Sequence, residues 1–131
     1  MHRLALSILF PVLCLLAADV GLAGRYAGEW KSNGAGGGGT FSMKLESASD
    51  VWKCEVSFTI GGADVKTTIR TCKVDQSKLE AVYGFELQGN ALESKISGQW
   101  NGKTFEGRYE TTAGSDAVDD GTWTAAPAAG Q

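Results

Sequence analysis

The sequence predicts an all-β domain, an eight-stranded antiparallel up-and-down meander that closes into a small barrel. Three observations support this prediction. Apolar and polar residues alternate with a period of two in successive segments, which is typical of strands with one buried face. Gly, Asn and Asp recur between these segments, as expected for tight turns, and no window has the period of an amphipathic helix. A two-sheet β-sandwich is the alternative.

The first 23 residues have the pattern of a secretory signal peptide. Arg3 precedes an apolar run from Leu4 to Leu16, and Gly21 and Ala23 place small residues at the −3 and −1 positions of a cleavage site. The apolar run is shorter than the roughly 20 residues that cross a bilayer. We therefore expect cleavage after Ala23, one domain over residues 24–131, and a secreted or periplasmic location.

The first four strands are expected at residues 25–32, 40–48, 51–60 and 64–74. Each has a stripe of inward residues two positions apart. The stripes are Tyr26, Gly28 and Trp30; Phe41, Met43 and Leu45; Trp52, Cys54, Val56, Phe58 and Ile60; and Val65, Thr67 and Ile69.

The fourth strand changes phase within its length. Cys72 and Val74 fall on the opposite face from Ile69 if the alternation is unbroken. Because both are apolar, we expect a β-bulge near Arg70 or Thr71 that returns them to the buried face.

Cys54 and Cys72 are expected to form a disulfide. They are the only cysteines that remain after cleavage, and an exported domain folds under oxidising conditions. If Ile60 pairs with Val65 across the intervening turn, the bulge brings the two cysteines opposite each other. The bond would contribute about 3 kcal/mol by constraining the unfolded chain. A pair of buried free thiols is the alternative.

The last four strands are expected at residues 78–88, 91–100, 103–112 and 121–125. Their inward stripes are Leu79, Ala81, Tyr83, Phe85 and Leu87; Leu92, Ile96 and Trp100; Phe105, Gly107 and Tyr109; and Trp123. Gly61-Gly62, Gly89-Asn90 and Asn101-Gly102 are the turn signals. Pairing of the first strand with the last would close the barrel and leave no exposed edge.

Composition and charge exclude several classes of function. The chain has 12 Lys+Arg and 15 Asp+Glu without a basic cluster, so we expect no nucleic-acid partner. The outward strand positions are rich in Lys, Arg and Glu, so we expect no membrane association after signal cleavage.

Catalytic chemistry has few candidate residues. The single histidine, His2, leaves with the signal peptide, which removes the usual Ser-His-Asp, Cys-His and histidine-zinc sites. The carboxylate pairs Glu80 with Glu86 and Glu106 with Glu110 fall on the outward phase of their strands. We therefore expect a non-enzymatic protein with no catalytic residues, no cofactor and no metal.

Two segments are predicted to be loops, residues 33–39 and 113–120. The glycine run Gly34 to Gly39 lacks the Lys-Ser/Thr ending and the following helix of a phosphate-binding loop. The acidic segment Asp116 to Gly121 lacks the ligand spacing of a calcium-binding EF-hand. Loops on rigid β-scaffolds commonly bind partners, so these two are the candidates for contact with another protein.

The inward aromatic residues are the candidate binding site. Aromatic side chains line small-molecule pockets but also fill cores, and an eight-stranded barrel either packs solid or holds one small ligand. The leading hypothesis is an exported barrel that binds a small apolar or aromatic ligand at one open end. The alternative is an interaction or inhibitor protein that acts through its loops on a packed scaffold. The predicted lining residues are Tyr26, Trp30, Trp52, Tyr83, Trp100, Tyr109 and Trp123.

One short motif suggests a family. Gly28-Glu29-Trp30 on the first strand, followed by an eight-strand meander after a signal peptide, resembles the calycin group of barrels, which includes avidin-like proteins and lipocalins. The resemblance covers the order of strands through residues 24–131 and implies a small barrel. Small secreted barrels that inhibit proteases or lysozymes are similar at this level. The Thr-Asp-Tyr element of lipocalins and their long C-terminal helix are missing, so no family site is transferred to this chain.

Overall fold

The computed structural model describes residues 21–128, and in this range it has nine strands and no helix. It accordingly has no helix there that is long and apolar enough to cross a membrane. Most of the predicted signal peptide lies outside the described residues. The strands are β1 Gly24–Ser32, β2 Gly38–Ala48, β3 Val51–Ile60, β4 Ala63–Val65, β5 Thr68–Asp75, β6 Lys78–Leu87, β7 Asn90–Trp100, β8 Phe105–Ala113 and β9 Asp116–Pro127.

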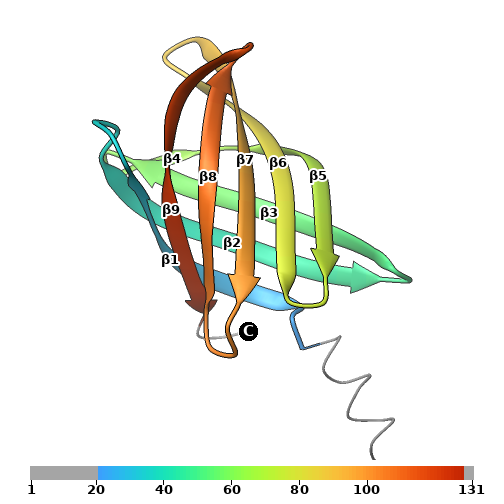
Figure 1. Cartoon of the computed structure of the whole chain (residues 1–131). Coiled ribbons are helices and arrows are strands. Elements are labelled where there is room, and N and C mark those ends of the chain that lie inside the picture. The colour runs from blue at the N-terminus through green and yellow to red at the C-terminus, as the bar shows by residue number, and fades with distance from the viewer. Residues whose placement is uncertain (1–20, 129–131) are drawn as a thin grey trace, which may run out of the picture.

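All nine strands belong to one antiparallel sheet with the order β4-β3-β2-β1-β9-β8-β7-β6-β5. The first strand pairs with the last, as predicted. The sheet curls, so that β1, β2 and β3 run behind and across β6 to β9 (Figure 1). The prediction of an all-β, barrel-like meander is confirmed.

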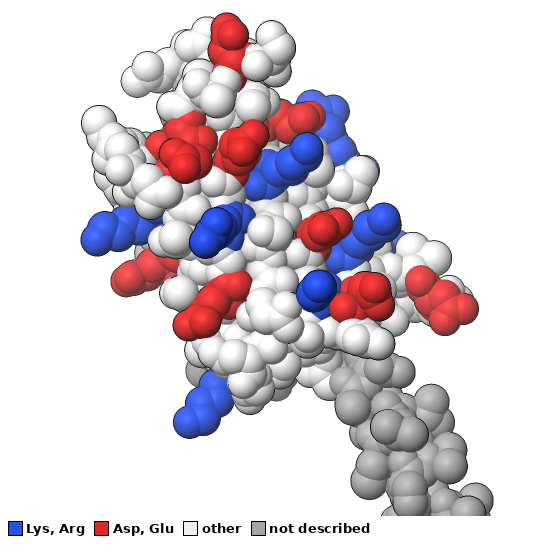
Figure 2. Space-filling view, viewed as in Figure 1, with Lys and Arg blue, Asp and Glu red and all other residues white. Residues whose placement is uncertain are grey.

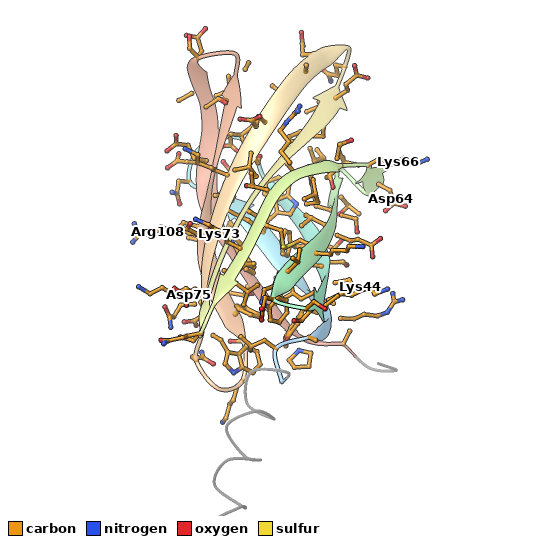
Figure 3. All side chains as sticks on the ribbon, turned by 90° about the vertical axis from the view of Figure 1, so that its right-hand side faces the viewer. Lys44, Asp64, Lys66, Lys73, Asp75 and Arg108 are labelled. Carbon is orange, nitrogen blue, oxygen red and sulfur yellow. A yellow bond between two sulfur atoms is a disulfide. The ribbon has the colours of Figure 1, made fainter. Side chains whose placement is uncertain are left out.

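The sequence predicts strand pairing all round the barrel, but the observed sheet is open on one side. Among the described residues no backbone ladder joins β3 to β5, and we call their facing edges the seam. The disulfide between Cys54 and Cys72 crosses the seam, with 5.7 Å between the Cα atoms, which confirms the predicted bond. The Thr67 hydroxyl also crosses it and donates to the Val56 carbonyl. Figure 3 looks from this side, and the six charged residues labelled there point away from the interior.

The hairpin between β3 and β4 differs in register from the prediction. Ile60 pairs with Ala63 and not with Val65. The reason is the turn, because Gly61 and Gly62 both have positive φ, 57° and 82°, which gives the shortest type of hairpin.

The predicted strand 64–74 is broken into β4 and β5. After Val65 the chain leaves β3 and continues as a partner of β6. The predicted bulge is present between Ile69 and Thr71, in the ladder with β6. It places Cys72 toward the interior, within reach of Cys54.

The last strand is longer than predicted and includes most of the residues of the predicted loop 113–120. Ala113 pairs with Asp116, so only Gly114 and Ser115 form the turn. Gly114 has a φ of 62°, which suits a two-residue connection and lets the β8–β9 hairpin extend. The acidic residues from Asp116 onward are therefore strand residues.

Two further turns differ from the prediction, one in length and one in position. Trp100 pairs with Phe105, so Asn101 opens a four-residue loop in place of a two-residue turn. The Asn101 side-chain oxygen accepts from the backbone N–H groups of the third and fourth loop residues, which stabilises the wider loop. The other turn consists of Gln88 and Gly89, one residue earlier than predicted.

The core lies on the inner face of the curled sheet. The largest fully buried side chains are Trp123, Phe105, Leu45 and Leu79. Trp123 on β9 lies over Gly98 and Gly107, which are paired on β7 and β8. A Cβ atom at Gly98 would be 2.6 Å from the indole ring, so the two glycines provide the space for it.

Candidate functional site

A cavity of about 990 Å³ occupies one end of the barrel. Its floor is made of buried residues, among them Phe41, Ile96 and Trp123. Its mouth is bounded by exposed residues of the glycine-rich loop 34–36 and of the β6–β7 and β8–β9 turns. These two hairpins project beyond the rest of the barrel (Figures 1 and 3). The cavity therefore opens to solvent between the hairpin tips and the loop.

Aromatic rings form much of the cavity wall. Trp30 on β1 makes edge contacts with Tyr109 on β8 and Phe58 on β3, with ring centroids 5.9 and 6.3 Å apart. Phe58 in turn contacts Phe85 on β6 at 5.1 Å. The Trp30 Nε1–H group donates to the Thr59 carbonyl at 2.9 Å. Since this donor is satisfied within the protein, the ring offers a ligand apolar and π surface.

Three hydroxyl groups lie side by side within the cavity. Tyr83, Ser94 and Thr111 occupy directly opposite positions on β6, β7 and β8. The Ser94 and Thr111 hydroxyls are 2.6 Å apart, and Ser94 also hydrogen-bonds to the Tyr83 phenol. Burial raises the pKa of Tyr83 to about 12, against the opposing effect of Ser94. Two bonds among three hydroxyls leave one O–H group and several lone pairs for a bound molecule.

The glycine-rich loop is tied to β9 at the cavity mouth. The Ser32 hydroxyl donates to Asp119 Oδ1 at 2.6 Å and accepts from the Gly34 backbone N–H at 3.0 Å. The Tyr109 hydroxyl donates to Asp119 Oδ2 at 2.8 Å. Burial, reinforced by the adjacent carboxylate, raises the pKa of Tyr109. Asp119 thus holds the loop against the wall, and we call these contacts the latch.

The charged residues that line the cavity are all acidic. They are Glu110, Asp119 and Asp120, and none of the described lining residues is a lysine or arginine. Figure 2 shows several acidic side chains gathered toward the upper end of the molecule, where the hairpin tips lie in Figure 1. A ligand that enters this end meets negative charge first.

The predicted binding residues divide into two groups. Trp30, Tyr83, Tyr109 and Trp123 line the cavity. Tyr26 and Trp100 contact each other at the opposite end of the barrel, and Trp52 lies beside the disulfide. The structure therefore brings four of the seven predicted residues to one site.

Several lining residues were not among those predicted. The sequence places Phe41, Phe58 and Phe85 on the inward face of their strands but in no site, and they supply much of the cavity lining. The sequence predicts that Asp119 lies in the loop 113–120. It lies four residues before Trp123 on β9 and shares its inward phase, and this alternation is the signal that identifies it.

Residues 21–128 contain no group of three or more His, Cys, Asp or Glu side chains placed to hold a metal ion. Comparisons with protein families, with curated proteins and with solved structures find no match for this chain. The function is therefore inferred from the cavity itself.

Proposed function

We propose that this protein is an exported, non-enzymatic barrel that binds one small apolar or aromatic molecule in the cavity. The observation that carries the proposal is the cavity of about 990 Å³ with aromatic walls. Sites for small molecules have volumes of about 300 to 1,000 Å³ and combine apolar walls with a few convergent polar groups. The hydroxyls of Tyr83, Ser94 and Thr111 are such a group.

The physical chemistry of the walls supports binding of an apolar body. The rings of Trp30, Phe58 and Phe85 line the cavity and offer solvent no strong hydrogen bond. A ligand that covers these rings removes their apolar surface from water, which is favourable. The Trp30 indole N–H and the Tyr109 hydroxyl already donate hydrogen bonds within the protein, so the ligand need not supply acceptors for them.

The proposed location is secreted or periplasmic. The Cys54–Cys72 disulfide is consistent with an oxidising compartment, because such bonds are rare where thiols are kept reduced. The N-terminal pattern of Arg3 and the apolar run after it supports the same location.

Mass spectrometry of the protein recovered from its exporting host tests the proposal. Native spectra should contain a species that carries a small molecule, and denaturing spectra should release that molecule. The ligand mass follows from the difference between the two. The same sample reports the first residue and the oxidation state of the cysteines.

A matched pair of variants locates the ligand. Trp30→Ala should reduce the retained fraction, whereas Trp52→Ala, outside the cavity, should keep it. A bare oxidised monomer, together with no change in tryptophan fluorescence across a ligand screen, would contradict the proposal. The loop 33–37 and the turn at Gly114 and Ser115, which remain of the two predicted loops, would then be tested by replacement for capture of a protein partner.

A further inference from the structure

The cavity wall leaves few polar groups for a ligand, and this limits what it can bind. The indole N–H groups of Trp30 and Trp123 donate to backbone carbonyls at 2.9 and 3.2 Å. The Tyr109 hydroxyl donates to Asp119. These three rings therefore present apolar and π surface, and the polar capacity lies in the hydroxyl row deeper in the cavity and in Asp119 at its mouth.

Asp119 brings a negative charge to the inner face of the mouth. Each of its oxygens accepts one hydrogen bond, from Ser32 and from Tyr109, and both donors are neutral hydroxyls. A carboxylate has about four acceptor positions, so it can accept further bonds. Within residues 21–128 no lysine or arginine forms an ion pair with Asp119. Its charge is thus available to a bound cation.

The other two acidic lining residues contribute less to the interior. Glu110 and Asp120 are paired across β8 and β9, and both are exposed. Lys95 lies directly opposite Glu110 in the neighbouring ladder and offsets its charge on the outer surface. Asp119 is therefore the group that sets the sign of charge inside the mouth.

The aromatic rings near Asp119 define where the body of a ligand would lie. Tyr109 hydrogen-bonds to Asp119, and Trp30 is in edge contact with Tyr109 at 5.9 Å. Tyr109 reaches the carboxylate through the hydroxyl at its ring edge, so the aromatic wall begins directly beside Asp119. A ligand whose ammonium group is at Asp119 can therefore place its apolar body against this wall.

We infer that the cavity binds an amine with an aromatic or apolar body, with the cationic nitrogen at Asp119 and the body against Trp30, Phe58 and Phe85. This inference rests on the proposed function, because it names the class of ligand for the same site. The hydroxyl row of Tyr83, Ser94 and Thr111 receives any polar atom at the far end of the ligand.

Three probes of one shape and different charge test the inference. They are 2-naphthylmethylamine, 2-naphthylmethanol and 2-naphthoate, each titrated at pH 7 with tryptophan fluorescence and calorimetry as readouts. We expect the amine to bind about tenfold more tightly than the alcohol and the naphthoate to bind most weakly. The advantage of the amine should decrease as salt is added, because salt screens a partly exposed charge.

Variants assign the preference to Asp119. Asp119→Asn should reduce the advantage of the amine over the alcohol to about twofold. Asp75→Asn, on the outer surface, should leave the tenfold ratio intact (Figure 3). Ser32→Ala weakens the latch but keeps the carboxylate charge, so it should retain the ratio and distinguish loss of charge from loss of the loop contact.

The outcomes separate the inference from the proposed function. If the alcohol quenches tryptophan fluorescence and binds as tightly as the amine, the inference is wrong and the proposed function stands. The same holds if Asp119→Asn leaves the tenfold ratio unchanged. If none of the three probes binds, the inference is overturned, and the proposed function is then decided by the native mass spectrum and the wider ligand screen.

Discussion

The two ends of this barrel are built from the same kinds of residue and differ in what covers them. At one end, which we call the packed end, Phe105 is 0% exposed and contacts Tyr26 and Trp100. At the cavity end, Trp30 and Phe85 are only partly buried, because the hairpin tips leave a mouth. Aromatic composition therefore does not distinguish a core from a site, whereas position along the barrel axis does.

Trp123 separates the two ends. The centroid of its ring lies 4.8 Å from that of Phe41 in the cavity and 6.3 Å from that of Phe105 in the packed end. The packed end also includes Leu22, which is buried and whose carbonyl accepts from the Tyr26 hydroxyl at 2.8 Å. Cleavage after Ala23 would remove that residue, so the position of cleavage determines how the packed end is covered.

Truncation of one phenylalanine at each end should show the largest contrast. Phe105→Ala should lower the free energy of unfolding by about 3 to 5 kcal/mol, because it leaves a cavity among rings that cannot collapse into it. Phe85→Ala, at the wall of an existing cavity, should cost about 1 kcal/mol, since little additional void forms. Urea denaturation of both variants measures the difference. Equal losses would mean that the cavity end is as tightly packed as the other.

Loss of the disulfide across the seam should have the next largest effect, because no backbone ladder joins β3 to β5. Replacement of Cys54 and Cys72 by serine should lower the free energy of unfolding by about 3 kcal/mol through loss of the loop constraint. Reductant should shift the urea midpoint of the natural protein and leave that of the serine variant unchanged. If the serine variant instead had the same urea midpoint as the oxidised natural protein, the Thr67 contact and the β4 pairing would suffice to hold the seam.

The contrast between the ends also shows what the sequence could predict. The alternation of Leu79 to Leu87 assigns inward positions, and the phase change before Cys72 locates the bulge. Neither gives the height of a residue along the barrel axis, because strand tilt and register set that height. Trp30 and Trp100 share the inward phase but lie at opposite ends for this reason.

The turns account for the remaining differences. Asn101-Gly102 is a strong signal for a two-residue turn, but the side-chain hydrogen bonds of Asn101 stabilise a four-residue loop there. The short turn at Gly114 extends β9 so that Asp119 becomes a strand residue, and its alternation with Trp123 places it on the inner face. The length of a turn also depends on how the two strands it joins are paired, and the local sequence does not specify that pairing.

Alkaline pH should weaken the cavity end through Tyr83. Its pKa is raised to about 12 in the folded protein against 10.0 for the free side chain. Folding therefore favours the protonated phenol, and its stabilising contribution is complete below pH 10 and is lost as the pH rises toward 12. The expected loss is on the order of 2 kcal/mol. Unfolding free energies measured at intervals between pH 9 and 12 provide the test.

Tyr83→Phe is the comparison for this titration. It should have a flatter pH dependence than the natural protein, although removal of the bond to Ser94 lowers its stability at every pH. Tyr26, at the packed end, also has a pKa raised by burial. Tyr26→Phe therefore shows how much of the pH dependence of the unfolding free energy comes from the packed end. Identical slopes for Tyr83→Phe and the natural protein would rule out Tyr83 as the source.

Loss of a latch contact should have a small effect on the free energy of unfolding, and the effect should be confined to the cavity mouth. Ser32→Ala removes the acceptor of the Gly34 and Gly36 backbone N–H groups and the donor to Asp119, at a cost of about 1 kcal/mol. Hydrogen exchange in residues 33–37 should accelerate by about fivefold, whereas exchange around Phe105 should not change. Ser42→Ala, exposed on β2, is the matched control. Faster exchange at both ends would mean that the loop supports the whole barrel, and the two ends would then not be independent.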